Sequence, residues 1–251
     1  VSGAQADALH LLALLLREKQ EAYDELQMRL ADYEEYVEAW AHETKMPVSL
    51  LSLLLDNRRE ELPEPVGAKL DYVQSRMQEC IDQMLFYARV KGMRKDYLFE
   101  RCSVCAHMEE VLEDYRPLLE EKRFRIERPA EDSMIYTDRR AFRFLLQQVV
   151  GNAVKYGGEE PKICFGMAMG EGVGILWIRD NGIGVRSCDL PFIFEKGFTG
   201  NCGDDRKKAT GMGLYLAAEI AKDLKLSLEA DSVWGEGFEM RIAFPLVGEG
   251  R

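Results

Sequence analysis

Apolar residues recur every seven positions over residues 9–40 of the chain. They occupy two interleaved phases that correspond to the a and d positions of a heptad repeat, and Lys19 is the one polar exception. The first phase holds Leu9, Leu16, Tyr23, Leu30 and Val37, and the second holds Leu12, Leu26, Tyr33 and Trp40. A seam of this length predicts a long helix that pairs with a second copy as a parallel two-stranded coiled coil.

The apolar pattern continues to Leu54 and ends at a break that contains Pro63 and Pro65. A second amphipathic helix is expected after the break, with one apolar stripe made of Leu70, Val73, Met77, Cys80, Ile81, Met84 and Ala88. Two helices joined by a short turn form a hairpin, and its stripe needs a partner surface. We therefore expect residues 31–92 to dimerise as a four-helix bundle, although a passive dimerisation rod would produce the same pattern.

Residues 93–251 predict strands and helices in mixed order. Strands are expected at 97–101, 124–127, 134–136, 163–169, 174–179, 225–230 and 237–244, and helices at 104–119, 139–156 and 213–224. These elements do not alternate regularly as strand, helix and strand, so they favour an α+β sandwich over a doubly wound sheet. The expected fold class is a multidomain α and α+β chain, in which a dimeric helical hairpin precedes an α/β sandwich.

The net charge of −11, from 33 Lys and Arg against 44 Asp and Glu, limits the kinds of partner. Nucleic acid is not expected, because neutralising phosphates requires clustered cations. The longest apolar run, Leu11–Leu16, is far shorter than the roughly 20 residues that span a bilayer, so membrane contact is expected only through segments outside this sequence. The six cysteines are too few for a disulfide framework, and Cys102 and Cys105 are expected to be reduced core residues rather than a zinc or redox site.

His42 is the histidine whose position suggests chemistry. If Val37 and Trp40 face the seam, His42 takes the f position, which is farthest from the partner helix. Pro47 follows and is expected to interrupt the helix. The neighbouring carboxylate of Glu43 can hold the proton on Nδ1 and leave Nε2 as a nucleophile, whereas the alternative is a solvated surface histidine.

A second group of polar residues lies on one face of the helix expected at 139–156. Gln148, Asn152 and Lys155 follow each other at spacings of four and three residues, which brings their side chains to the same side. Mg²⁺ keeps several of its waters and takes few protein oxygens, so an amide ligand here suits a magnesium–phosphate group. An ordinary amphipathic helix is the alternative for this segment alone.

Two glycine-containing segments complete the candidate chemistry. Asp180, Gly182 and Gly184 combine an acceptor with bare backbone at the end of a strand, where a flat base can donate its amino protons to the carboxylate. Gly211 and Gly213 open a helix whose first amide groups can bind phosphate. Neither a P-loop nor a Rossmann fingerprint is present, and a D-x-G-x-G segment taken alone is also compatible with a plain turn.

Taken in order, these segments resemble the sensor histidine kinases of two-component systems, which use the Bergerat ATP-binding fold shared with gyrase, Hsp90 and MutL. The likeness rests on an H box at His42–Pro47, an N box at Gln148–Tyr156, glycine boxes at Asp180–Gly184 and Thr210–Gly213, and an F box at Phe192–Phe198. It covers nearly the whole chain from about Leu26. Trp40–His42 and Phe194–Gly200 are most similar to the short sensors that work beside peptide-antibiotic ABC transporters.

The resemblance implies a role for each matching residue. His42 would accept the phosphoryl group, and Glu43 would take or orient its proton. Asn152 would bind Mg²⁺ directly and Gln148 would reach it through water, while Asp180 would accept from the adenine amino group. Further contacts to ATP are implied for Lys155, Tyr156, Gly182, Gly184, Arg206, Thr210, Gly211 and Gly213.

The resemblance also implies an organisation and a set of partners. Residues 1–30 would form a signalling coiled coil, 31–92 the dimerisation and histidine phosphotransfer hairpin, and 93–251 the catalytic ATP-binding domain. The partners would be a second copy, the receiver domain of a response regulator and an ABC transporter permease. The chain would be the cytoplasmic part of a bacterial cell-membrane protein.

Two other functions remain as alternatives. An ATP-driven clamp of the gyrase, Hsp90 or MutL type needs a hydrolytic base at position 148, and the glutamine there is a poor one. An ATP-dead scaffold would not need Asn152 and Asp180, which are both intact. Met46 is a separate departure, because the thioether cannot hold the water that a hydroxyl or amide would align for a phosphatase step.

Overall fold

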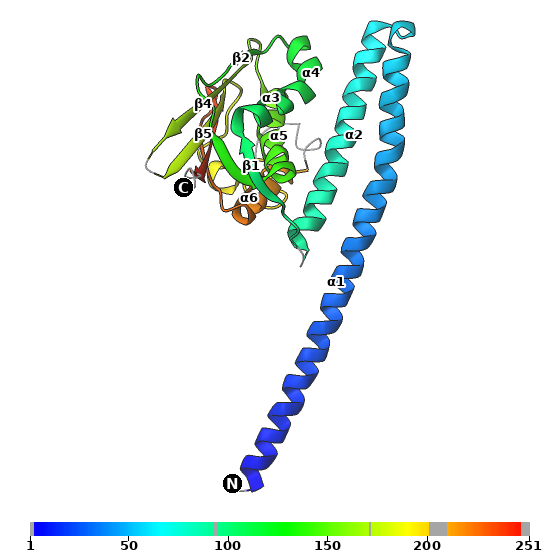
Figure 1. The fold of residues 1–251 in the computed structure, drawn as a ribbon, viewed down its shortest axis with the longest axis vertical. Coiled ribbons are helices and arrows are strands. Elements are labelled where there is room, and N and C mark those ends of the chain that lie inside the picture. The colour runs from blue at the N-terminus through cyan, green and yellow to red at the C-terminus, as the bar shows by residue number, and fades with distance from the viewer. Residues whose placement is uncertain (1–2, 93–94, 171, 201–209, 247–251) are drawn as a thin grey trace.

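The computed structural model of the chain describes residues 3–92, 95–170, 172–200 and 210–246. The N-terminal part is a long helical hairpin, and the C-terminal part is a mixed α/β domain that lies beside it (Figure 1). Within the described ranges, no helix combines the length and hydropathy that crossing a bilayer requires.

The hairpin consists of two helices that pack closely. α1 (Gly3–Asn57) and α2 (Glu64–Lys91) are joined by the 3-10 turn η1 (Arg59–Glu61), as the break in the apolar pattern predicted. Ala41 and Val48 of α1 are buried together with Ile81 of α2. The d residue Trp40 remains half exposed, so in a single chain the predicted seam has no partner surface.

Pro47 does not interrupt α1, contrary to the expectation from the sequence. A proline inside a helix removes one backbone hydrogen bond and costs roughly 3 kcal/mol. In this hairpin α2 supports the helix on both sides of the proline, because Ala41 and Val48 are both buried against Ile81. We infer that this packing offsets the cost and lets α1 continue to Asn57.

The C-terminal domain is built on a five-stranded sheet with the strand order β2-β4-β5-β7-β6. Its strands are β2 (Arg125–Glu127), β4 (Lys162–Met169), β5 (Val173–Asp180), β6 (Ser227–Val233) and β7 (Gly237–Pro245). β2 runs parallel to β4, and the other neighbours pair antiparallel. A separate antiparallel pair joins β1 (Phe99–Ser103) to β3 (Met134–Asp138).

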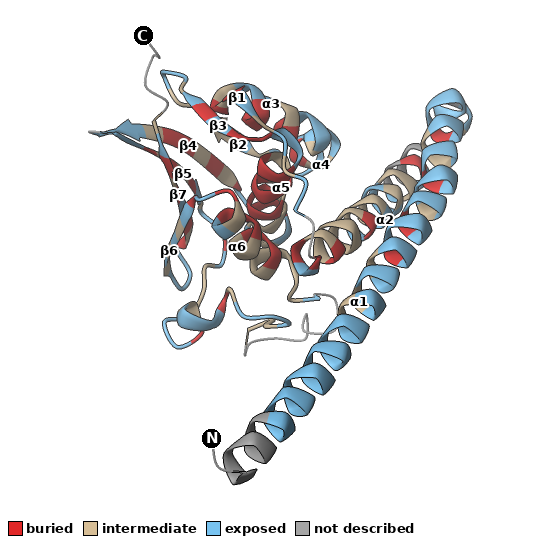
Figure 2. Ribbon diagram, turned by 60° about the horizontal axis from the view of Figure 1, so that its bottom comes forward, coloured by how far each residue is buried: buried red, intermediate tan, exposed pale blue. Residues whose placement is uncertain are grey.

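Helices cover one face of this sheet, and the core lies between the two layers (Figure 2). They are α3 (Val104–Asp114), α5 (Arg139–Tyr156) and α6 (Gly213–Asp223), with the short α4 (Arg116–Glu121) and η2 (Leu190–Phe192) at the periphery. Phe142 and Leu145 of α5, Ile220 of α6 and Leu176 of β5 are fully buried. The predicted α/β sandwich is therefore confirmed, and α5 has the bounds that the sequence predicted.

Several other boundaries differ from the predicted ones, and three of them have a clear local reason. The helix expected at 104–119 splits into α3 and α4, because Pro117 lacks an N–H group and its ring clashes with the preceding turn. β1 begins two residues later than predicted, and Tyr97 instead donates a hydrogen bond from its hydroxyl to Asp223 of α6 at 2.9 Å. β6 also begins two residues later, since Lys225 ends the preceding helix with a φ of 58°.

Candidate functional site

A cavity of about 230 Å³ lies between α5, the end of β5 and the start of α6. It collects nearly all the candidate ATP-binding residues that the structure describes, namely Gln148, Asn152, Lys155, Tyr156, Asp180, Gly184, Thr210, Gly211 and Gly213. Gly182 is buried next to Asp180 and does not line the cavity. Arg206 and its neighbours Lys207 and Lys208 lie outside the described residues.

α5 presents one polar face to this cavity. The side chain of Asp138 caps the helix by accepting a hydrogen bond from the backbone N–H of Ala141 at 2.8 Å, which fixes where the helix begins. Along the face, Gln148 is buried, Asn152 is half-buried and Lys155 is exposed. Among the described residues, none hydrogen-bonds to the side chain of Asn152, so its amide can engage a ligand.

Asp180 ends β5 and supplies a carboxylate to the cavity. Its Oδ1 accepts a hydrogen bond from the backbone N–H of Gly182 at 2.8 Å. Burial raises the pKa of the Asp180 carboxyl above its usual range, while the N–H groups of Gly182 and Phe238 oppose the rise. The remaining acceptor capacity of a half-buried carboxylate suits the amino group of a flat heterocycle.

Close backbone packing requires glycine in two parts of the cavity wall. At Gly184, which has a φ of 66°, a Cβ would lie 2.3 Å from the carbonyl oxygen of Val233. At Gly211, which has a φ of 63°, a Cβ would lie 2.4 Å from the carbonyl carbon of Gly197. The positive φ and the lack of space both exclude a side chain at Gly184 and Gly211. The cavity wall at these two positions therefore consists of backbone alone.

α2 contributes residues to the same cavity that the sequence analysis did not identify. Arg76, Glu79 and Gln83 line it, and Gln83 donates a hydrogen bond from Nε2 to Oε1 of Gln148 at 3.2 Å. The only signal in the sequence is that Glu79 and Gln83 are polar residues one helical turn apart, which is also typical of a solvated helix face. The hairpin therefore forms one side of the nucleotide cavity.

His42 faces a second and larger cleft of about 800 Å³ between the hairpin and the C-terminal domain. The histidine is exposed, as its f position predicted, and Glu38 one turn earlier lines the same cleft. Glu43 does not line it, and within the described part of the chain Glu43 makes no hydrogen bond to His42. Successive residues of a helix point about 100° apart, which explains why the neighbouring carboxylate turns away.

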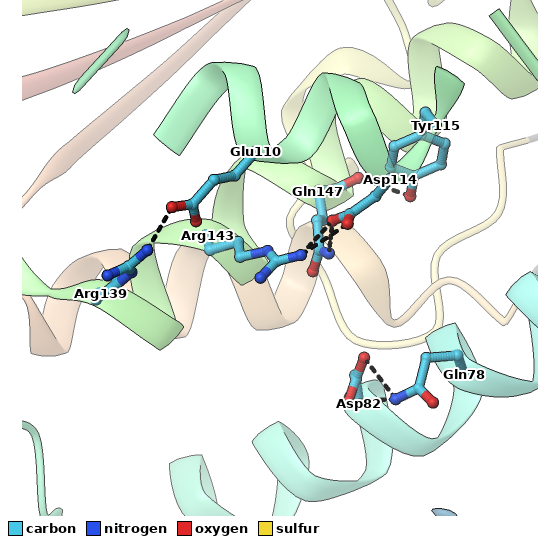
Figure 3. A network of polar contacts seen from close by, with 8 residues as sticks. All are labelled: Gln78, Asp82, Glu110, Asp114, Tyr115, Arg139, Arg143 and Gln147. Carbon is cyan, nitrogen blue, oxygen red and sulfur yellow. Dashed lines mark hydrogen bonds and ion pairs between the residues drawn. The ribbon is translucent and has the colours of Figure 1, made fainter. Parts of the chain in front are cut away.

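Charged side chains occupy both walls of this cleft (Figure 3). On the domain side, Arg143 donates hydrogen bonds to both carboxylate oxygens of Asp114 at 2.7 Å. On the hairpin side, Gln78 donates to Asp82 at 3.1 Å, and burial raises the pKa of Asp82 while Lys45 and Arg143 oppose the rise. The cleft that His42 lines therefore has both cations and carboxylates among its lining residues.

The two cavities adjoin. Arg76, Glu79 and Gln148 line the nucleotide cavity and also the cleft that holds His42. These three residues come from α2 and α5, which belong to different parts of the chain. The nucleotide cavity and the cleft of His42 are therefore direct neighbours.

Comparison with known proteins agrees with this arrangement. Residues 137–248 match the family described as histidine kinase-, DNA gyrase B-, and HSP90-like ATPase. Sensor protein kinase GraS of Staphylococcus aureus (strain JH1) is 30% identical over 226 residues, which are 90% of this chain and 64% of that relative. The chain is therefore similar to sensor histidine kinases over most of its length. It spans 64% of the length of the curated relatives that it matches.

Solved structures show the same fold in both parts of the chain. Full-length ShkA in complex with AMPPNP aligns with a TM-score of 0.63 and 19% identity, over 86% of this chain and 47% of that chain. Acinetobacter baumannii histidine kinase AdeS aligns with a TM-score of 0.52 and 22% identity, over 82% and 98% of the two chains. The resemblance to sensor histidine kinases that the sequence predicted is borne out by these comparisons, and the clamp and scaffold alternatives are not favoured.

Proposed function

We propose that the chain autophosphorylates His42 with ATP and passes the phosphoryl group to an aspartate of a response regulator. The wall shared by the two cavities, formed by Arg76, Glu79 and Gln148, carries this proposal. ATP in the nucleotide cavity would bring its γ-phosphoryl group beside the cleft of His42. The match of residues 137–248 to a family of ATPases supports ATP as the nucleotide.

The residues of the nucleotide cavity fit a magnesium nucleotide. Asn152 would hold Mg²⁺ through its amide oxygen, since this hard cation prefers oxygen ligands, and Gln148 would contact it through water. When bound, Mg²⁺ would neutralise charge on the phosphates. Asp180 would accept from the adenine amino group, and the amide groups at the start of α6, from Gly213 onward, would bind phosphate. Secondary contacts to ATP are proposed for Lys155, Tyr156, Gly184, Arg206, Thr210 and Gly211, whereas Gly182 would act through Asp180, to which its backbone N–H donates.

The transfer step needs a free lone pair on His42. The Nε2 lone pair would attack the γ-phosphorus, the bond from that phosphorus to the bridging oxygen would break, and ADP would leave with the electron pair. The proton on Nδ1 would pass to a carboxylate in the same cleft, for which we propose Glu38 in place of Glu43, because Glu38 lines the cleft of His42 and Glu43 does not. Little bond chemistry falls to the protein in such a transfer, so positioning and charge neutralisation supply most of the rate.

The apolar surface of the hairpin supports a homodimer. Trp40 and Leu54 on α1 are 50% and 52% exposed, and Val73 and Met77 on α2 are 48% and 41% exposed. Burying such side chains against a second hairpin would remove them from water, as in a four-helix bundle. We therefore propose residues 1–30 as a signalling coiled coil, 31–92 as the dimerisation and phosphotransfer hairpin, and 93–251 as the catalytic domain.

The wider setting of the chain is also a proposal. The similarity to relatives named sensor protein kinases supports a response regulator as the acceptor and the cytoplasmic side of a bacterial membrane as the location. The resemblance of Trp40–His42 and Phe194–Gly200 to the sensors of peptide-antibiotic transporters supports an ABC transporter permease as a further partner.

Incubation with γ-labelled ATP and Mg²⁺ tests the function. We expect acid-labile, base-stable label on the wild type and on His10→Gln, a matched control at an exposed histidine of the same helix. No label is expected on His42→Gln, Asn152→Asp or Asp180→Asn. Label retained by His42→Gln would refute the assignment, free phosphate without label would indicate a clamp, and neither product would indicate a scaffold.

A further inference from the structure

The turn between β6 and β7 brings an aromatic side chain to the nucleotide cavity. Trp234 is 49% exposed and lines the cavity together with Ile183 and Arg186. Both neighbours come from the loop that follows Asp180, so Trp234 lies at the end of the cavity where the base acceptor is. No motif in the sequence marks Trp234 for this position.

Backbone contacts fasten this turn to the Asp180 loop. The N–H of Gly235 donates to the carbonyl oxygen of Ile183 at 2.8 Å, and the N–H of Val185 donates to Oγ of Ser232 at 2.7 Å. The same hydroxyl donates to the carbonyl oxygen of Gly237 at 2.6 Å, which closes the turn. Trp234 is therefore held in place by a turn that is hydrogen-bonded to the Asp180 loop.

Arg186 stacks on the indole ring. Its guanidinium carbon lies 5.0 Å from the ring centroid of Trp234, which is within the range of a cation–π contact. Indole rings and guanidinium groups both stack on nucleobases, because every base has a flat π-face. The pair thus offers a flat wall close to the carboxylate of Asp180, which suits an amino group of the base.

We propose, on the basis of the function proposed above, that Trp234 with Arg186 stacked on it is the base-stacking wall of the nucleotide site. A purine whose amino group meets Asp180 lies with its ring plane against this pair. A larger ring system gains more from stacking, so the wall favours purine over pyrimidine nucleotides. Trp234 is then a specificity-determining residue and takes no part in the transfer step.

Binding of ADP and CDP to the chain tests this wall by calorimetry and tryptophan fluorescence. We expect Trp234→Ala to weaken ADP binding about tenfold or more and to reduce the preference for ADP over CDP. Trp234→Phe should keep most of the affinity for ADP and most of this preference. Arg186→Ala should weaken ADP about threefold. ADP should quench the emission of the wild type and of Trp40→Phe but not of Trp234→Phe. Val233→Ala is the matched control, because Val233 is an exposed residue at the end of β6, next to Trp234, and does not line the cavity.

The outcomes separate this inference from the proposed function. Wild-type affinity in Trp234→Ala, with binding still lost in Asp180→Asn, overturns the stacking wall and leaves the kinase proposal intact. Equal weakening of ADP binding and CDP binding in Trp234→Ala also overturns the stacking wall, since a preference for the larger ring system is its defining property. If the wild type binds no ADP, or if Asp180→Asn binds as well as the wild type, the proposed function fails and the wall with it.

Discussion

Burial removes the Asp180 carboxyl from part of its contact with water, and it raises the pKa of this carboxyl above 3.8. The carboxyl accepts a hydrogen bond from an amino group at full strength only when it is ionised. Because its pKa is raised, it begins to protonate at a higher pH than an ordinary aspartate does. We therefore expect the affinity for adenosine, which has no phosphate to titrate, to fall on acidification before an ordinary aspartate would protonate. Calorimetric titrations between about pH 8 and pH 4 measure this. An affinity that stays constant over the whole range would contradict it.

Gly151, which lines the nucleotide cavity, shows how tightly α5 packs against Tyr115. A Cβ at this position would lie 2.7 Å from the hydroxyl oxygen of Tyr115, which is shorter than real Cβ contacts allow. We expect Gly151→Ala to lower the free energy of unfolding by about 1–3 kcal/mol, because overpacking outweighs the better helix propensity of alanine. Urea unfolding checks the loss.

Two further variants control this prediction. Tyr115→Phe in the Gly151→Ala background removes the clashing oxygen and should recover much of the loss. Gly67→Ala in α2 has no heavy atom within 4 Å of its Cβ and should be stabilising by about 0.5–1 kcal/mol. A loss in Gly151→Ala that persists in the double variant would show that the hydroxyl is not the cause.

At the scale of the element, α2 serves the hairpin and the nucleotide cavity through different faces. Ile81 packs in the hairpin, while Gln83 hydrogen-bonds to Gln148 of α5 at 3.2 Å. If Gln148 contacts the metal through water, nucleotide binding must compete with this bond. We expect Gln83→Ala to raise the affinity for Mg²⁺–ADP about two- to tenfold, the range that one neutral hydrogen bond supplies.

The matched control for this prediction is Gln78→Ala on the same helix. Gln78 hydrogen-bonds to Asp82 and lines the cleft of His42 but not the nucleotide cavity. Its substitution should leave Mg²⁺–ADP affinity unchanged in the same titration. Weaker binding in Gln83→Ala would show instead that α2 supports the bound nucleotide.

At the scale of the whole molecule, the heptad pattern predicts which exposed residues a second copy would cover. Leu26 and Trp40 take d positions and are 65% and 50% exposed, whereas Met46 takes a c position and is 75% exposed. We expect Leu26→Glu with Trp40→Glu to shift the chain from dimer to monomer in sedimentation velocity, because buried carboxylates have no partner in the seam.

Met46→Glu is the control, since it adds the same charge to the same helix away from the seam. It should sediment as the wild type does, and ADP affinity should be unchanged in all variants because the nucleotide cavity lies outside the seam. A wild type that sediments as a monomer would remove the dimer from the proposed organisation.

The sequence by itself determined the features that depend on neighbours along the chain. Periodicity set the hairpin, and the cap at Asp138 with the apolar spacing after it set α5 to its observed bounds. The side chains of Gln148, Asn152 and Lys155 lie on one face because residues three and four positions apart are neighbours on the surface of a helix. The family was recognisable for the same reason, since each of its motifs is short and local.

Only the tertiary structure decided what depends on contacts between distant segments. Pro47 stays within a continuous helix because α2 supports both sides of it. Gln83 enters the nucleotide cavity through a contact with a residue 65 positions away, and Trp234 enters it through a turn fastened to the Asp180 loop. The sequence around a polar or aromatic residue is the same whether its side chain faces solvent or a ligand. Which of the two it faces is decided only when the two parts of the chain pack together.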